Sequence, residues 1–197
     1  MINEVTALTL NFSSLIGKVS DEELELLSRD NPDARIEINS HGYLIFMSPT
    51  GGETGYRNLR LAFQVELWNK RTKLGKVFDS STGFRLSNDA IRSPDVSWIP
   101  NVKWNALSKE QRRKYLPIDP NFVIELMSPT DVLSETQRKM EEYISCGVKL
   151  GWLINPDERK VEIYRQGQDT EILDNPETLR GEDVMSGLVV NLEEIFD

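Results

Sequence analysis

A chain of 197 residues with 39% hydrophobic and 28% charged residues is expected to fold around a buried core rather than to remain disordered. Its net charge of -9 argues against avid, non-specific nucleic-acid binding, but it allows a local basic groove and suits binding of hard cations such as magnesium. A single histidine, His41, and a single cysteine, Cys146, argue against a zinc site and against Ser-His or Cys-His nucleophilic catalysis.

The sequence also carries signals about cellular location. No stretch of about 18 consecutive apolar residues predicts a membrane span. The first residues lack the basic and apolar regions of a signal peptide. One cysteine cannot form an intramolecular disulfide, which suits a reducing compartment. We therefore expect a cytoplasmic protein without a membrane partner.

The chain opens with a predicted helix and a β-hairpin. Residues 18–29 are predicted as a short acidic helix in which Ser20 and Glu23 fit a capping box. Residues 34–47 are predicted as two strands joined by a Ser-His-Gly turn.

A long helix follows the first of two Met-Ser-Pro-Thr stretches, at 47–50. Residues 53–75 are predicted as helical because apolar side chains recur at steps of three and four, at Tyr56, Leu59, Phe63 and Leu67. Gly75 is the predicted stop signal. Short strands are then predicted within 76–86 and 94–100.

Residues 100–121 form a predicted insertion that is polar and contains a basic run. Within it, residues 108–116 are predicted as a helix with Ser108 and Gln111 as a capping pair. The basic run is a candidate surface for contact with nucleic acid, although a solvated helix face is the commoner fate of such a run.

The remaining chain alternates strands and helices. Residues 122–127 are predicted as a strand that leads to the second Met-Ser-Pro-Thr stretch, and residues 134–147 as a helix capped by Ser134 and ended by Gly147. Further strands are predicted at 150–155, 161–166 and 171–173. This order predicts a single domain over 1–197 of mixed α/β (α+β) class, in which helices pack on a mixed sheet.

Two carboxylates and one lysine stand out as candidates for chemistry. Glu125 lies inside an apolar strand, where a carboxylate is costly unless it is paired, protonated or bound to a metal. Asp95 opens the strand after Pro94, a place that is also common in turns. Lys139 lies in the second turn of the following helix, and its side chain should lean back toward the Glu125 strand. The structural alternatives are that Glu125 reaches water or a salt bridge from an edge strand, and that Lys139 is simply solvated.

Pro94-Asp95 followed by Glu125 resembles the motif of the PD-(D/E)XK nuclease superfamily. The lysine that usually stands two residues after the Glu is absent, because Met127 occupies that place. The sequence instead resembles a variant of the superfamily in which the lysine has moved to the next helix, where Lys139 lies.

A wider set of motifs over roughly residues 20–197 resembles the Uma family of restriction-endonuclease-like proteins. The set comprises the hairpin running into "MSPTGG", then "SPDVSWIP", "VIELMSPTD", a Lys and a Tyr four apart, "LGWLINP" and "GLVVNLEEIF". The resemblance implies a restriction-endonuclease-like core over about 20–165. It also implies magnesium-dependent phosphodiester cleavage, with manganese as a substitute ion, most readily of DNA. Asp95 and Glu125 would hold the metal, and Lys139 would orient the attacking water.

The resemblance suggests further residues. Glu53, at the start of the long helix, stands where the superfamily often has another acidic residue, although an acid there also suits the helix dipole. Glu37 is a weaker candidate that would otherwise be an exposed cross-strand residue. Gln137 is a third, with capping of Ser134 as its alternative. Residues proposed to contact nucleic acid are Arg57, Arg112, Arg113 and Lys114, with Trp98 and Trp104 as candidate stacking groups.

Three functions remain open at this point. The first is a magnesium-dependent endonuclease that acts as a homodimer, because cutting both strands of DNA often takes two sites. The second is a binding or scaffold protein that keeps the nuclease fold with a degraded site, which Met127 and the acidic charge favour. A metal-free carbohydrate hydrolase with two carboxylates is a third class, without a supporting pattern.

Overall fold

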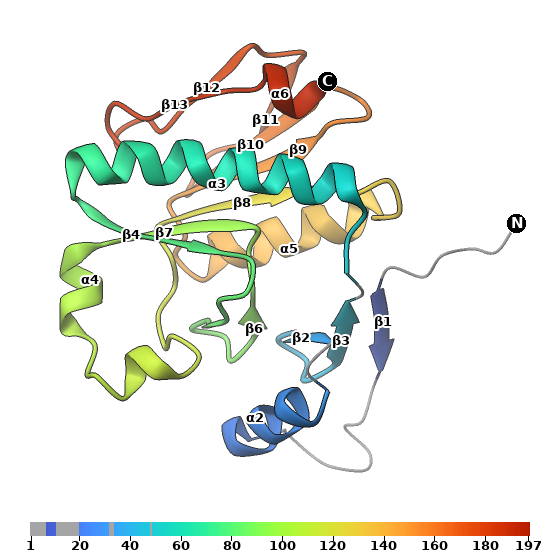
Figure 1. Ribbon diagram of the computed structural model, residues 1–197, viewed down its shortest axis with the longest axis vertical. Coiled ribbons are helices and arrows are strands. Elements are labelled where there is room, and N and C mark those ends of the chain that lie inside the picture. Colours follow the sequence, from blue (N-terminus) through green and yellow to red (C-terminus); the bar gives the residue numbers. More distant parts are fainter. Residues whose placement is uncertain (1–6, 11–19, 32–33, 48) are drawn as a thin grey trace, which may run out of the picture.

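The structure is a computed structural model that describes residues 7–10, 20–31, 34–47 and 49–197. Its centre is a six-stranded sheet with the order β11-β10-β9-β8-β7-β4 (Figure 1). The strands of this sheet are β4 (Gly75–Asp79), β7 (Val96–Pro100), β8 (Phe122–Leu126), β9 (Leu150–Asn155), β10 (Lys160–Arg165) and β11 (Glu171–Asp174). β8 and β9 run parallel and the other neighbours are antiparallel, which confirms the predicted mixed sheet.

Two helices cover the two faces of this sheet. α3 (Gly52–Thr72) packs its buried residues against the same core as Phe122 and Ile124 of β8. α5 (Leu133–Ser145) packs against the core that holds Val123. Because side chains alternate along a strand, Glu125 shares the α5 face with Val123. Figure 1 shows α3 and α5 on either side of β8.

The C-terminal segment extends the core on the α3 side. It contains a two-stranded sheet of β12 (Thr178–Arg180) and β13 (Val189–Asn191), followed by α6 (Glu193–Phe196). Leu179, Val190 and Ile195 are buried in the cluster that also holds Leu61 of α3. This segment therefore fixes one flank of the long helix.

A second, five-stranded sheet carries the N-terminal hairpin. Its order is β1-β3-β2-β6-β5, with β1 (Ala7–Leu10), β2 (Arg35–Ile38), β3 (Leu44–Met47), β5 (Phe84–Arg85) and β6 (Ile91–Arg92). α2 (Asp21–Asp30) packs on it through Leu24, and the predicted capping box of Ser20 and Glu23 is formed. β2 and β3 pair antiparallel, which confirms the hairpin.

Three predicted helix boundaries were wrong. The α3 helix ends at Thr72, and Lys73 takes the left-handed conformation with φ 56°, whereas Gly75 already belongs to β4. Gly75 serves a different purpose, because a Cβ there would run into Trp98 and the Ile99 carbonyl. The other two boundaries concern residues 108–116 and Ser134.

Residues 108–116 contain only a short 3-10 turn, Gln111–Arg113. The reciprocal bonds between Ser108 and Gln111 do form, but no helix extends beyond them. An unpredicted helix, α4 (Asn101–Ala106), precedes the turn. In α5 the N-cap is Val132, so Ser134 lies inside the helix and does not cap it. None of the described helices is both long and apolar enough to cross a membrane.

Candidate active site

A cleft of about 560 Å³ lies between the hairpin, the start of α3 and α5. Thr50, from the first Met-Ser-Pro-Thr stretch, and Ser128, from the second, both line it. Each stretch therefore connects a strand to a helix beside the same cleft. Ser48 of the first stretch lies outside the described residues. The charged residues of the cleft come from β2, β6, β8 and α5 and from the loops that precede β7 and α5.

The Glu125 carboxylate is held by two groups of α5. Lys139 Nζ lies 2.9 Å from Glu125 Oε1, and the Tyr143 hydroxyl donates a hydrogen bond of 2.8 Å to the same oxygen. These residues lie four apart on the helix and so share one face. Among the described residues, both contacts end on Oε1, which leaves Oε2 available on the same carboxylate.

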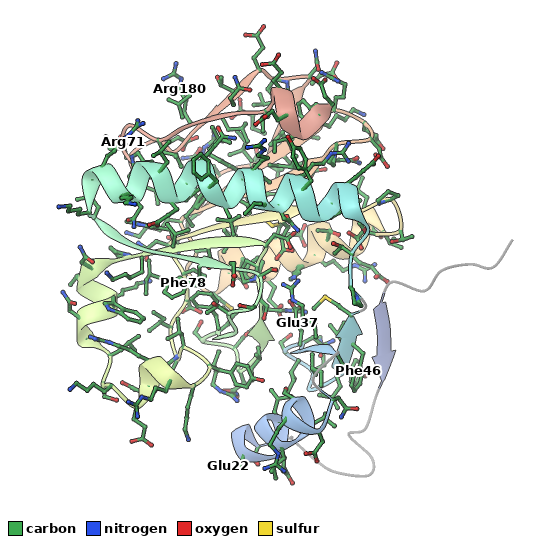
Figure 2. The ribbon with its side chains drawn as sticks, in the orientation of Figure 1. Glu22, Glu37, Phe46, Arg71, Phe78 and Arg180 are labelled. Carbon is green, nitrogen blue, oxygen red and sulfur yellow. The ribbon has the colours of Figure 1, made fainter. Side chains whose placement is uncertain are left out.

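Glu37 of β2 holds the other side of Lys139. Lys139 Nζ lies 3.0 Å from Glu37 Oε1, so the ammonium bridges two carboxylates. Arg92 donates to Glu37 Oε2 at 3.1 Å, and the Ser93 N–H donates to Oε1 at 2.9 Å. Glu37 is only 1% exposed, and Figure 2 shows it in the interior of the molecule, whereas Glu22 of α2 lies at the outside.

Asp95 stands at the N-terminal edge of β7. Val96 pairs with Ile124, so the antiparallel register brings Asp95 opposite Glu125, with both side chains on one face. Asp95 Oδ2 accepts a hydrogen bond of 2.9 Å from the Leu126 N–H, and the Asn58 amide approaches Oδ1 at 3.4 Å. Asp95 and Glu125 both line the cleft.

The two carboxylates bound to Lys139 have opposite pKa shifts. Burial, reinforced by the charges of Asp95 and Glu37, raises the pKa of Glu125 to about 7, although Lys139 opposes this rise. Burial would also raise the pKa of Glu37, but the nearby cations Lys139 and Arg92 hold it at about 2. Glu37 is thus ionised at neutral pH, while Glu125 is poised between its two forms.

The pKa values of Lys139 and Asp95 are shifted as well. Burial would lower the pKa of Lys139, but Glu125 and Glu37 raise it above its ordinary value, so the ammonium stays charged at neutral pH. Burial raises the pKa of Asp95, against the hydrogen bond from the Leu126 N–H. The site thus combines a fixed cation with carboxylates that burial makes costly to ionise.

The model of the Uma2 family, described as "putative restriction endonuclease", matches residues 21–193. The chain belongs to the Uma2 family. Its fold is similar to the crystal structure of a "putative nuclease belonging to DUF820" from Anabaena variabilis, with a TM-score of 0.68 and 22% sequence identity. That similarity covers 82% of this chain and 89% of the other. Among curated proteins, no match is found.

The donor set of this Uma2 protein fits a hard divalent cation. Carboxylate oxygens are the ligands that Mg²⁺ prefers, and Mg²⁺ commonly takes only one or two carboxylates, with water and substrate oxygens as the other ligands. Asp95 and Glu125 supply two such carboxylates at the ends of adjacent strands. No group of three or more His, Cys, Asp or Glu side chains within the described ranges is arranged to hold a metal. The fit is therefore to a two-carboxylate site.

Two of the additional candidates lie away from this cluster. Glu53 has an 83% exposed side chain, pairs with Arg57 at 3.9 Å and does not line the cleft. Gln137 neither caps Ser134 nor enters the cleft, because its amide donates to Glu162 of β10 at 2.8 Å. Glu37, by contrast, is brought into the centre of the site.

The residues proposed for nucleic-acid contact do not line the cleft. Arg57 has a side chain only 13% exposed, and Arg112 stacks over the Trp104 ring at 4.6 Å. Arg113 and Lys114 line a separate surface cavity of about 490 Å³. Trp98 is buried in the core and is not available for base stacking, and Trp104 is covered on one face by Arg112.

Sequence reasoning missed three members of the site. Tyr143 was part of the family pattern, but its bond to Glu125 was not foreseen. Arg92 and Glu142 form a second buried pair, with 2.6 Å between Arg92 Nε and Glu142 Oε2. The available signal was the spacing of Lys139, Glu142 and Tyr143, which places all three on one side of a helix that follows the Glu125 strand.

Proposed function

We propose that this protein is a divalent-metal-dependent endonuclease that hydrolyses phosphodiester bonds of DNA, with magnesium as its ion and manganese as a substitute. The observation that carries the proposal is Lys139 bridging Glu125 and Glu37 in a cleft that also contains Asp95. Membership of the Uma2 family supports it. The cytoplasm, where magnesium and nucleic acid are both present, is the proposed location.

Asp95 and Glu125 would hold the metal. When bound, the ion supplies charge stabilisation for the reacting phosphate and lowers the pKa of a coordinated water. The other steps fall to side chains of the protein itself. His41 lines the cleft on the hairpin side, but no residue of the charged cluster is a histidine.

Lys139 acts as a cation and not as a general base. Its pKa is raised, so it holds its proton at neutral pH and can donate hydrogen bonds to a phosphate oxygen or to the attacking water. Glu37 keeps that ammonium charged and oriented from the side away from Glu125. Tyr143 fixes the rotamer of Glu125 through Oε1, so that Oε2 remains for a ligand.

Met127 explains why the lysine is supplied from the helix. It is 8% exposed and packs in the core beside α5, so its side chain does not enter the site. Lys139 reaches Glu125 from the neighbouring helix and supplies the positive charge that this strand position lacks. The departure from the usual motif is thus compatible with catalysis.

Calorimetry with Mg²⁺ and with Mn²⁺ tests the site directly. The wild type is compared with the double variant Asp95→Asn plus Glu125→Gln, which keeps the size of both side chains. A charge-matched control, Glu53→Gln plus Asp157→Asn, removes two exposed carboxylates outside the cleft. We expect binding in the wild type and in the control, and none in the site variant.

Cleavage is then measured on supercoiled plasmid, linear DNA and RNA, because nicking of a closed circle requires an endonuclease. We expect plasmid cleavage by the wild type with Mg²⁺ or Mn²⁺, and loss of cleavage in Lys139→Met. Absence of cation binding, both without and with DNA, together with absence of cleavage, would refute the proposal. That outcome would favour the alternative of an inactive nuclease-fold binding protein.

A further inference from the structure

The cleft contains one half-buried arginine that no carboxylate neutralises. Arg35 of β2 lines the cleft, and it forms no ion pair with any acidic side chain in the described part of the chain. Arg92 and Lys139 are the other cations largely buried in the cleft, and each of them bridges two carboxylates. A cation removed from water is costly unless an anion compensates its charge. The exception at Arg35 therefore needs an explanation.

The guanidinium of Arg35 also has unused hydrogen-bond donors. It carries five N–H groups. Among the described residues, only Nη2 has an acceptor, the Ser93 carbonyl at 2.6 Å. Nε is buried and has no acceptor within those same residues. One held nitrogen gives the planar group a fixed orientation, and the remaining donors suit the oxygens of a carboxylate or a phosphate.

Arg35 lies beside the residues proposed to hold the metal. Ser93 is two residues before Asp95 in the chain, so its carbonyl holds the guanidinium near the start of β7. Side chains two apart on a strand share a face, which places Arg35 on the side of β2 that carries Glu37. Burial raises the pKa of Asp95, and the charge of Arg35 is among those that oppose the rise. An anion bound to Arg35 would therefore lie next to the metal site.

We propose that Arg35 binds a phosphate group of the substrate strand and positions that strand against the metal site. A phosphate provides the opposite charge and several acceptor oxygens for the guanidinium. Glu37 does not fill this role, because it already pairs with two other cations. The proposal takes its substrate from the nuclease function above, but it concerns binding and not cleavage.

A purely structural role for Arg35 makes a different prediction. Tying β2 to the Ser93 carbonyl uses one donor and needs no charge, so a neutral side chain with an N–H group could replace it. Arg138 also lines the cleft, but it is exposed, so water can solvate its charge without an anion. A neutral substitution of Arg35 therefore separates phosphate binding from structural support.

Binding of a short single-stranded DNA oligonucleotide tests the role of Arg35 without cleavage. All variants carry Asp95→Asn and Glu125→Gln, which remove the proposed metal carboxylates, and affinity is measured in a chelator over a series of salt concentrations. We expect Arg35→Gln to weaken binding about tenfold. The slope of log affinity against log salt should fall by about 0.7, the value for one phosphate contact with a single strand. Arg35→Lys keeps the charge and should keep the slope.

Arg180→Gln is the matched control. Arg180 on β12 is exposed and does not line the cleft, and Figure 2 shows it at the outside of the molecule, away from Glu37. This substitution should leave both the affinity and the slope unchanged. Circular dichroism establishes that each variant is folded.

Oligonucleotides with a 5′-hydroxyl and with a 5′-phosphate separate the two sources of a phosphate group. An equal loss of affinity on both would identify an internal phosphodiester as the ligand of Arg35, and a loss confined to the phosphorylated one would identify a terminal phosphate. No binding of either oligonucleotide by the parent, or a folded Arg35→Gln that keeps the parent's salt slope, would overturn the proposal. Failure of the wild type to cleave DNA would count against the nuclease function alone, because binding is measured without metal.

Discussion

Replacing Glu37 with glutamine removes one negative charge from the buried network and keeps the size of the side chain. Glu37 is 1% exposed and accepts bonds from Lys139, Arg92 and the Ser93 N–H. The two cations keep one other carboxylate each, since Lys139 contacts Glu125 and Arg92 contacts Glu142. The substitution therefore isolates the contribution of the Glu37 charge.

The magnitude follows from the pKa of Glu37. It falls from an ordinary 4.5 to about 2 in the folded protein. At about 1.4 kcal/mol per pKa unit, ionised Glu37 stabilises the fold by about 3 kcal/mol. Removal of one partner from a buried ion pair costs a similar amount, about 3–5 kcal/mol. We expect Glu37→Gln to lower the free energy of unfolding by about 3 kcal/mol at pH 7.

The loss of unfolding free energy in Glu37→Gln should become smaller as the pH falls. Because the folded pKa of Glu37 is lower than the unfolded one, its stabilising contribution is complete above pH 4.5 and disappears as the pH falls toward about 2. The difference between wild type and variant should thus be constant from pH 7 to pH 5 and shrink below that. Urea denaturation at pH 7, 5, 4 and 3.5 measures it.

Glu53→Gln is the matched control, since it makes the same chemical change at a carboxylate whose side chain is 83% exposed. It should change the free energy of unfolding by less than about 1 kcal/mol at every pH, since an exposed acid in the first turn of a helix contributes little. A Glu37→Gln variant as stable as the wild type at pH 7 would refute the reasoning. So would a difference that stays the same at pH 3.5, because the effect would then come from packing and not from charge.

Two further substitutions test the site and the core. Tyr143→Phe removes the hydroxyl that bonds Glu125, so urea denaturation should show a loss of about 1 kcal/mol with the fold retained, and an unchanged stability would contradict the hydrogen bond. Gly75→Ala places a methyl group against Trp98, and a loss of about 2–3 kcal/mol is expected in thermal unfolding. Gly51→Ala, where a Cβ meets nothing within 4 Å, is its control, and because Gly51 is the N-cap of α3 a smaller loss, below about 1 kcal/mol, is expected.

Much of the framework could be predicted because it depends on local patterns. An apolar run interrupted by Glu125 predicted a buried strand with one costly charge, and that strand is β8, buried throughout. The direction in which helical side chains lean predicted that Lys139 would return toward this strand, and its Nζ does lie 2.9 Å from Glu125. Periodicity in the same way predicted α3 and the hairpin.

The local patterns failed where a covering partner comes from a distant part of the chain. Glu37 was only a weaker site candidate, with an exposed cross-strand position as its alternative, and the structure buries it against Lys139 and Arg92, which are 102 and 55 residues away in sequence. Tyr56, Leu59, Phe63 and Leu67 correctly indicated a helix, yet they form its outer face, and Leu61 and Val65 face the core. Periodicity shows that a face is apolar and does not show what covers it.

The sequence by itself therefore indicated the elements around the cleft, the family resemblance and the candidate trio of Asp95, Glu125 and Lys139, but it missed α4 and predicted a helix at 108–116 where only a 3-10 turn forms. Only the tertiary structure shows that Glu37 contacts Lys139 beside this trio and that Glu53 does not line the cleft. The physical reason is that a buried charge is tolerated only where opposite charges and hydrogen-bond donors surround it. That surrounding is assembled from β2, β6, β8 and α5 only when the two sheets meet.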